Sequence, residues 1–276
     1  MNTQHKPYSI DQLVDLYFNQ LLPMKEIAST VGISQDYVRQ LLRRAGYKKR
    51  DRMSLPHRHA SRPKMDVSPT PEQEQIIFGT LLGDATLKRP RMFGGKHMNS
   101  ALGVRHSAKQ EEFVRWKNEM LKPFSFPVHF MDRTEKRERW KDVVTNQTIY
   151  FNCVSHSYFT NLYPLWYPEG TKVFDPSNIK NLDFLGLAVW FMDDGTYGHS
   201  KSSPYGFLCT EGFGLESQEA IKNFLHFQFD LACSVVSTGL GSKKIRLSAS
   251  GMKLLQEKLK PIIQENVPSM LYKLGC

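Results

Sequence analysis

Two aspartates stand at matching places in two apolar segments of the chain. Residues 77–85 read IFGTLLGDA and residues 187–195 read LAVWFMDDG, so Asp84 and Asp194 both occupy the eighth position. Such apolar runs, with turn residues behind them, predict helices that end at the acid. A carboxylate is unfavourable there, because the helix dipole is negative at the C-terminus. Either the acids only end the apolar runs, or they bind a metal ion.

The rest of residues 71–276 predicts the elements that must position these acids. Segments such as VHFMDR, TIYFNCV and KIRLSAS are typical of strands, and QEEFVRWKNEML and SQEAIKNFLHFQF are typical of amphipathic helices. Their order of helix, strands and helices occurs twice, which indicates an internal duplication and an α+β fold.

The two acidic segments differ at the positions that would let their helices touch. Gly79 and Gly83 are four residues apart, so they share a helix face and allow another backbone to approach. Val189 and Asp193 hold the matching places in the second segment, which predicts a less symmetric contact. We therefore assign Asp193 to helix packing or to the turn, and not to a metal.

Both acidic segments resemble copies of the LAGLIDADG motif, and residues 70–276 resemble a single-chain, two-motif LAGLIDADG homing endonuclease. The segments HSAKQEEF, NLYPLWYPEGTK and PSMLYKL agree with that family in order and spacing. The resemblance implies a pseudo-two-fold duplicated, αββαββα-like saddle that binds DNA, with the motif helices packed along the axis. It implies hydrolysis of one phosphodiester per strand.

The resemblance also implies a metal site. Two carboxylates brought together at adjoining helix ends repel each other, and a divalent cation between them keeps both ionised. Oxygen ligands favour a hard cation, so we expect Mg²⁺, with Mn²⁺ as an alternative. The expected ligands are Asp84, Asp194 and the backbones of Ala85 and Gly195.

Four further residues are candidates for the same site. By resemblance, Lys172 and Lys273 match the basic residue of each half that lies near the scissile phosphate, where a lysine stabilises transition-state charge. Without the family, each would be an exposed surface lysine. Glu211 stands where many relatives have a polar amide, and it either adds a metal or water contact or marks a drifted site. His106 occupies the comparable region of the first half, with a structural role as the alternative.

Residues 1–48 predict a small all-α helix-turn-helix domain. The small Ala28, the turn residue Gly32 and the apolar Val38 and Leu41 have the spacing of that motif, and an ordinary helical hairpin is the alternative. Residues 49–70 are basic and rich in Pro and Ser, so we expect a linker before the duplicated domain at 71–276. The candidate DNA contacts of the whole chain are Gln35, Arg39, Gln40, Arg43, Arg44, Arg105, Lys243, Lys244 and Arg246.

The charge of the chain points to a polyanionic partner. The formal charge is +10, of which +7 lies in residues 1–65 and +3 in residues 66–276, so a nucleic-acid-binding N-terminal part is expected. The four cysteines form no CxxC pair, which argues against a zinc site or a disulfide framework. No signal peptide or apolar run of membrane-spanning length is evident, so we expect an intracellular protein of a bacterial or phage-infected cell, or of an organelle.

The sequence therefore predicts a monomeric, site-specific double-strand DNA endonuclease with a long target. A transcription regulator that grips DNA without cutting it and an RNA-binding intron maturase remain as alternatives. Both acids and both lysines are present, which argues against a nuclease that has lost its cleavage activity but is compatible with a maturase. The termini carry no splicing-type residues, so an intein is not expected.

Overall fold

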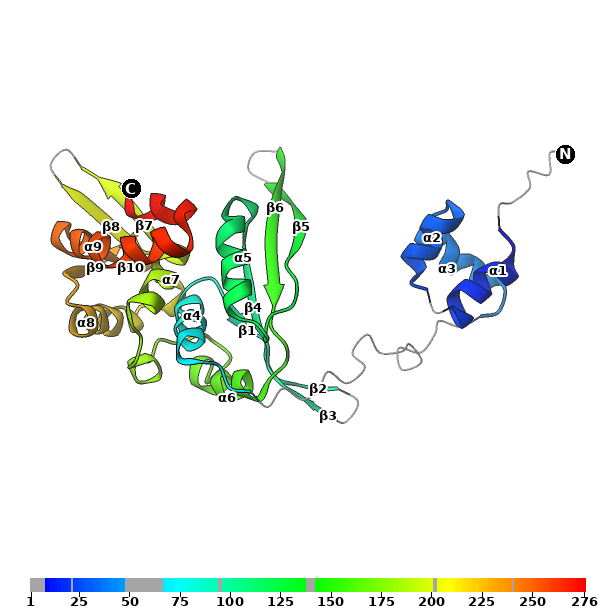
Figure 1. Ribbon diagram of the computed structural model, residues 1–276, viewed down its shortest axis with the longest axis horizontal. Helices are drawn as coiled ribbons and strands as arrows, with labels where there is room; N and C mark the ends of the chain where they lie inside the picture. The colour runs from blue at the N-terminus through cyan, green and yellow to red at the C-terminus, as the bar shows by residue number, and fades with distance from the viewer. Residues whose placement is uncertain are drawn as a thin grey trace. The chain divides into compact units, whose positions relative to one another are not determined.

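The computed structural model describes residues 8–20, 22–47, 67–93, 96–137, 142–200, 203–239 and 241–276. The chain divides into two compact units, Met1–Asp66 and Val67–Cys276 (Figure 1). The predicted linker at 49–70 lies outside the described residues except for 67–70. In the part that is described, no helix has both the length and the apolar character needed to cross a membrane.

The N-terminal unit is helical around one small core. Its elements are α1 (Ile10–Val14), a π-helical turn η1 (Asp15–Asn19), α2 (Met24–Val31) and α3 (Gln35–Arg44). Between α2 and α3, Gly32 adopts φ 70° and its N–H donates to the carbonyl of Ala28. Ser34 then caps α3 by accepting a hydrogen bond from Tyr37 N at 3.1 Å. Ala28, Val38 and Leu41 are buried, so the four predicted positions form the tight turn and its apolar support.

The larger unit contains two halves with the same order of elements. The first half has α4 (Pro71–Leu82), β1 (Thr86–Leu87), β4 (Leu102–Ser107), α5 (Glu111–Met120), β5 (His129–Arg137), β6 (Asp142–Asn152) and α6 (Ser157–Trp166), with a hairpin of β2 (Arg91–Phe93) and β3 (Lys96–Met98) between β1 and β4. The second half has α7 (Phe184–Asp194), β7 (Gly195–His199), β8 (Pro204–Leu208), α8 (Ser217–Phe229), β9 (Cys233–Ser237), β10 (Lys243–Leu247) and α9 (Ala249–Asn266). Short 3₁₀ helices complete them, namely η3 (Ala108–Gln110), η4 (Pro176–Ile179), η5 (Glu211–Phe213) and η6 (Pro268–Leu274). The predicted duplicated αββαββα fold is confirmed.

Each half folds into a four-stranded antiparallel sheet with one strand order. The first sheet runs β1-β4-β6-β5 and the second runs β7-β8-β10-β9, so equivalent strands hold equivalent places. Helix α5 packs on β4 and β6, and α8 packs on β9 and β10. Burial alternates along β4, where Leu102, Val104 and His106 are buried and Arg105 is exposed. Each sheet therefore has a face covered by helices and a face that remains open.

Helices α4 and α7 lie side by side at the centre of the unit and join the halves (Figure 1). A Cβ added at Gly79 would lie 2.3 Å from the Gly186 carbonyl oxygen and 2.8 Å from the Val189 Cβ. One added at Gly83 would lie 2.4 Å from the Asp193 Cβ. The glycines of α4 therefore make room for the larger residues of α7, which is the asymmetric contact that the sequence predicts.

Gly79→Ala is expected to destabilise the larger unit. Its methyl group meets a backbone carbonyl, which cannot rotate away, so we expect the free energy of unfolding to fall by about 1–3 kcal/mol. Gly212→Ala is the matched control, because a Cβ at Gly212 has no atom within 4 Å. Chemical denaturation of both variants measures the difference. Equal stability of the two would contradict the close helix contact.

Candidate active site

The two acids lie where a central helix ends and a strand begins. Asp84 follows the C-cap of α4, Gly83, and its side chain is 43% exposed. Asp194 is the last residue of α7, and β7 begins at the next residue. The Ala85 N–H donates to the carbonyl of Thr80 at 2.8 Å, and the Cys209 N–H donates to the carbonyl of Asp194 at 3.0 Å. These main-chain bonds fix both junctions while leaving the two carboxylates available.

The carboxylates crowd one another. Burial, and then the carboxylates of Asp193 and Asp84, raise the pKa of Asp194 to about 7. Burial and Asp193 also raise the pKa of Asp84, while His106, Lys117 and Lys273 act in the opposite direction. The ends of α4 and α7 therefore form a site whose ionised state needs a positive charge.

Asp193 is held in a buried ion pair between the two halves. Its Oδ1 accepts from Lys117 Nζ at 2.6 Å, and both side chains are fully buried. Its Oδ2 accepts from Thr80 Oγ1 at 3.0 Å and from the Asp84 N–H at 3.4 Å. Because every one of these partners donates, both oxygens are acceptors. Burial raises the pKa of Asp193, and the charge and hydrogen bond of Lys117 oppose that shift. Asp193 thus belongs to the helix contact.

The donor atoms at this site identify which carboxylates fit a metal. Within the described residues, Asp84, His106 and Asp193 bring ligand atoms within 4.8 Å of one another. The Asp193 oxygens are already engaged, and His106 Nε2 lies 3.2 Å from Lys117 Nζ. Asp84 is the exposed member of this group, and Asp194, the second predicted ligand, is not part of it. Of the two predicted backbone ligands, Ala85 is buried and the Gly195 carbonyl accepts a hydrogen bond from Lys273 Nζ at 2.9 Å.

Lys172 and Lys273 occupy equivalent positions beside the two acids. Lys172 Nζ donates to the carbonyl of Gly83 at 3.0 Å. Lys273 Nζ donates to the carbonyls of Asp193 at 3.1 Å and Gly195 at 2.9 Å. Burial lowers the pKa of Lys172 to about 8, although the nearby aspartates oppose the shift. Each ammonium group thus sits at the negative end of a motif helix, one residue from its acid.

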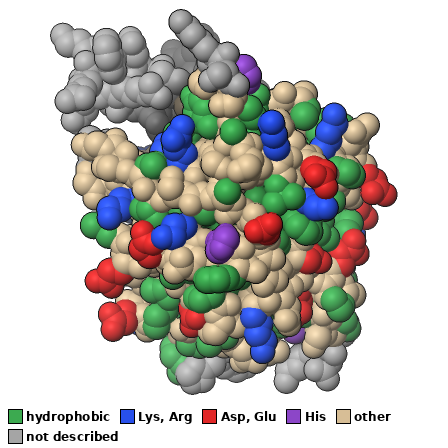
Figure 2. Space-filling model, turned by 90° about the vertical axis from the view of Figure 1, so that its left-hand side faces the viewer, with side chains coloured by type: hydrophobic (Ala, Val, Ile, Leu, Met, Phe, Trp, Pro, Cys, Tyr) green, Lys and Arg blue, Asp and Glu red, His purple; other side chains and the backbone are tan. Residues whose placement is uncertain are grey.

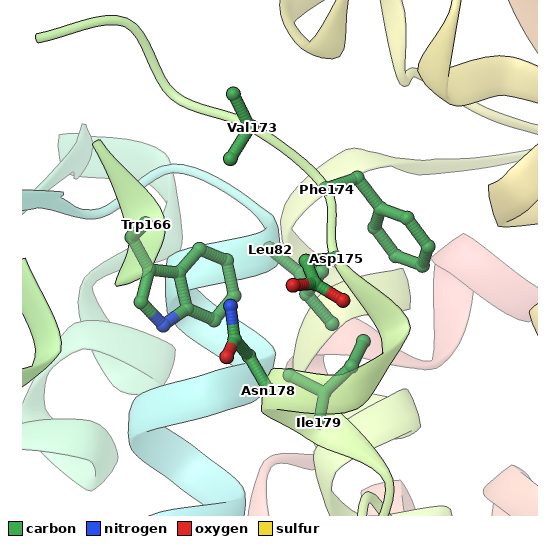
Figure 3. Close-up of a pocket in the computed structure, with 7 residues that line it drawn as sticks. All are labelled: Leu82, Trp166, Val173, Phe174, Asp175, Asn178 and Ile179. Atoms are coloured by element: carbon green, nitrogen blue, oxygen red, sulfur yellow. The ribbon is translucent and has the colours of Figure 1, made fainter. Parts of the chain in front are cut away.

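Packing after α6 fixes the position of Lys172. The Val173 N–H donates to the Trp166 carbonyl at 2.9 Å, and Phe174 stacks on Trp190 of α7 with ring centroids 6.4 Å apart. The small pocket in Figure 3 lies beside this segment, and it has no space for a bound molecule. Its lining is Leu82, Trp166, Val173, Phe174, Asp175, Asn178 and Ile179. This segment therefore supports the end of α4 and is not a ligand site.

His106 and Glu211 occupy the flanks of the site. His106 Nδ1 lies 3.3 Å from Asp84 Oδ2, so the imidazole contacts the first acid directly. Glu211 begins η5, where the preceding Thr210 is fixed by the buried amide of Gln218. Burial, Glu211 and Asp194 raise the pKa of the Cys209 thiol, which indicates that Glu211 lies on the Asp194 side of the site.

Three residues of this network were not among the sequence candidates, namely Thr80, Lys117 and Gln110. Lys117 lies in a segment that the sequence predicts only as an amphipathic helix. Its position four residues after the buried Phe113 places it on the apolar face, which is the signal that could have identified it. Gln110 Oε1 lies 3.1 Å from His106 Nδ1, and Gln110 Nε2 donates to Tyr272 OH at 3.2 Å. The contacts of these residues connect segments that are far apart in the sequence.

The predicted DNA contacts fall into two groups on separate units. Gln35, Arg39, Gln40, Arg43 and Arg44 are all exposed on α3, where Arg39 also pairs with Asp36.

In the larger unit, Arg105 and Arg246 lie exposed on the open faces of their sheets, over the rings of Tyr150 and Tyr205. Lys244 shares the face of Arg246, whereas Lys243 stands at the start of β10 on the other face. On the side of the second half in Figure 2, positive and negative side chains are interspersed, so this side offers no single-sign surface.

A duplicated αββαββα fold with an acid at the end of each central helix is the architecture of two-motif LAGLIDADG proteins. A family model described as the LAGLIDADG DNA endonuclease family matches residues 74–255, and the chain belongs to this family.

Relatives include the cytochrome b mRNA maturase bI2 of Debaryomyces hansenii, which is 25% identical over 205 residues, or 74% of each chain. DNA endonuclease I-ChuI of Chlamydomonas applanata is 26% identical over 225 residues, 76% of this chain and 97% of the relative. The protein RecA of Mycolicibacterium flavescens matches at 26% over 220 residues, and this match spans 46% of that relative.

A solved structure shares the fold. The homing endonuclease I-WcaI bound to its DNA recognition sequence superimposes with a TM-score of 0.64 and 22% identity. The match covers 75% of this chain and 88% of that one, so it includes both halves of the larger unit.

Proposed function

We propose that this protein is a metal-dependent, site-specific endonuclease of double-stranded DNA that acts as a monomer. The observation that carries the proposal is the position of Asp84 and Asp194 at the ends of the packed helices α4 and α7, with a lysine ammonium hydrogen-bonded to a carbonyl one residue from each acid. The relative I-ChuI is a DNA endonuclease, and I-WcaI was solved on its DNA recognition sequence. One chain supplies both halves, so a second copy is not needed.

The side chains divide the work between metal and phosphate. Asp84 and Asp194 would hold Mg²⁺ or Mn²⁺, which supplies polarisation of the phosphate and activation of a water when bound. Lys172 and Lys273 keep a positive charge beside each acid and are placed to stabilise negative charge that develops on a phosphate. Each half thus contributes one acid and one lysine to the cutting of one strand.

Selection from a randomised DNA library tests the function. Incubation with Mg²⁺ is expected to yield double-strand ends within one related set of sequences, and chelation with EDTA should abolish them. If neither Mg²⁺ nor Mn²⁺ gives cleaved ends with folded protein, the endonuclease proposal is wrong.

Metal binding is expected to release protons near neutral pH. Because the pKa of Asp194 is raised to about 7, this carboxyl is largely protonated at pH 6 and ionised at pH 8. Protons therefore compete with the cation at pH 6, and affinity for Mg²⁺ should rise as pH increases through 7. Calorimetry at both pH values measures this, with Asp194→Asn as the control that removes the titrating group. A pH-independent affinity would contradict the expected ligand.

We also propose that the N-terminal unit is a DNA-binding arm with α3 as the recognition helix. Arg43 lies exposed on α3, and a contact of this residue with phosphate would release about one counterion. Arg43→Gln is therefore expected to reduce the slope of log affinity against log salt by about 0.9. Lys258→Gln, at an exposed lysine of α9 paired with Glu257, is the control. An unchanged slope for Arg43→Gln would argue against the contact.

RNA splicing is the second candidate function, because the relative from Debaryomyces hansenii is a maturase. A maturase would stimulate splicing of its intron RNA, whereas the metal-binding acids serve DNA cleavage. Splicing that is retained by Asp84→Asn and Asp194→Asn, beside lost cleavage, would show that both functions coexist.

A further inference from the structure

The carboxylate of the first acid, Asp84, contacts the end of a chain of hydrogen bonds that crosses the interior. Lys117 Nζ lies 2.6 Å from Asp193 Oδ1, 2.7 Å from Thr80 Oγ1 and 3.2 Å from His106 Nε2. An ammonium group has three hydrogens and no lone pair, so these acceptors use all of its donors. Burial lowers the pKa of Lys117, but its ion pair with Asp193 opposes this shift and favours the ammonium form. Toward that ammonium group, His106 Nε2 presents its lone pair.

This contact determines the tautomer of His106. A second neighbour of Nε2, Asp193 Oδ1, lies farther away at 3.5 Å, and it already accepts from Lys117. The proton of the neutral ring is consequently on Nδ1, which is hydrogen-bonded to Gln110 Oε1 at 3.1 Å and lies 3.3 Å from Asp84 Oδ2. The protonated edge of the His106 ring is thus fixed by Gln110 in contact with the Asp84 carboxylate.

The second half lacks this arrangement in the part of the chain that the structure describes. At the motif position of Thr80 it carries Trp190, whose buried indole N–H has no partner there. After the matching strand β8, the contact with Asp194 comes from the main chain, where Cys209 N donates to the Asp194 carbonyl. The carboxylate of Asp194 is therefore not oriented by an imidazole, and the two acids are held differently.

We propose that His106, with its tautomer set by Lys117, is a positioning residue for Asp84 and thereby for the cutting of one DNA strand. This inference rests on the proposed endonuclease function, in which each half serves one strand. Loss of the Nδ1 donor leaves Asp84 free to turn away from the productive orientation, while Asp194 keeps its own contacts. We therefore expect the variant enzyme to cleave one DNA strand first and the other strand later.

The test measures each strand separately on a duplex of the cognate site with a different label on each strand. His106→Phe keeps a ring against Phe113 but removes both nitrogens. We expect it to slow one strand about tenfold more than the other, so that a supercoiled plasmid accumulates as the nicked circle. The exposed His226→Gln is the control and should keep the wild-type strand ratio.

Two further variants separate positioning from structure. His106→Asn can place an amide donor where Nδ1 lies and should restore the strand ratio, whereas His106→Gln places it near Nε2 and should not. Equal slowing of both strands, or equal ratios for Asn and Gln, would overturn the inference. Failure of the wild-type protein to cut either strand would instead refute the endonuclease function.

Discussion

Asp194→Asn is expected to abolish DNA cleavage and yet to stabilise the metal-free protein. Asparagine keeps the shape of the side chain but removes the charge that a divalent cation needs. Loss of an outer partner of a metal ligand costs roughly 10–100-fold, so loss of a ligand itself should cost more than about 100-fold. Asp84→Asn is expected to have the same effect on cleavage.

The gain in stability follows from the pKa of Asp194. A folded-state pKa raised to about 7, from 3.8, means that the folded protein binds the proton more tightly than the unfolded chain. Stability therefore falls as pH rises from the unfolded pKa through 7, and the full penalty is present at pH 8. Asparagine removes it, so thermal unfolding at pH 8 should shift upward.

Glu257→Gln is the control, since it removes one exposed acid of α9. It should leave cleavage and melting temperature unchanged. Cleavage at the wild-type rate by either aspartate variant, with DNA binding intact, would contradict the assignment of the active site.

Lys117→Met is expected to cause a large loss of stability. The substitution leaves Asp193 buried without its counter-charge, and breaking a buried pair from one side costs about 3–5 kcal/mol. Methionine keeps most of the length of the side chain, so the loss reports the charge and not a cavity. Denaturation in urea measures the change.

A double variant identifies the cause of this loss. Lys117→Met combined with Asp193→Asn removes both charges and should be more stable than Lys117→Met alone. Lys122→Met is the surface control, because this exposed lysine pairs with Glu119 and such pairs contribute about 1 kcal/mol or less. If the double variant were no more stable than Lys117→Met, an uncompensated Asp193 would not be the reason.

Local patterns in the sequence predict much of this molecule. The duplicated order of helices and strands follows from short-range apolar periodicity, and the turn of the N-terminal unit follows from the spacing of Ala28, Gly32, Val38 and Leu41. The spacing of Gly79 and Gly83 against Val189 and Asp193 likewise predicts the asymmetric helix contact, which the geometry confirms. Asp84 and Asp194 were marked by their unfavourable place at a helix end.

The partners of buried polar groups could not be predicted in the same way. His106 lies on the same face of β4 as Leu102 and Val104, so its burial can be predicted from the two-residue period of a strand. The atom that contacts its ring nitrogen cannot be predicted in this way. Lys117 and Asp193 are 76 residues apart and meet only after both helices have packed. A sequence identifies the buried face of an element, whereas the identity of a polar partner depends on the tertiary arrangement.

The contact between α4 and α7 also explains why one half could not replace the other. Two copies of the second half would bring Val189 and Asp193 against the same residues, with neither glycine to receive them and two buried anions without Lys117. Two copies of the first half would leave empty space beside Gly79 and Gly83. Each half is therefore complementary to the other and not to itself, so halves produced as separate polypeptides should pair as a heterodimer. The specificity of pairing therefore resides in the surfaces of α4 and α7. The covalent link only keeps the two halves together.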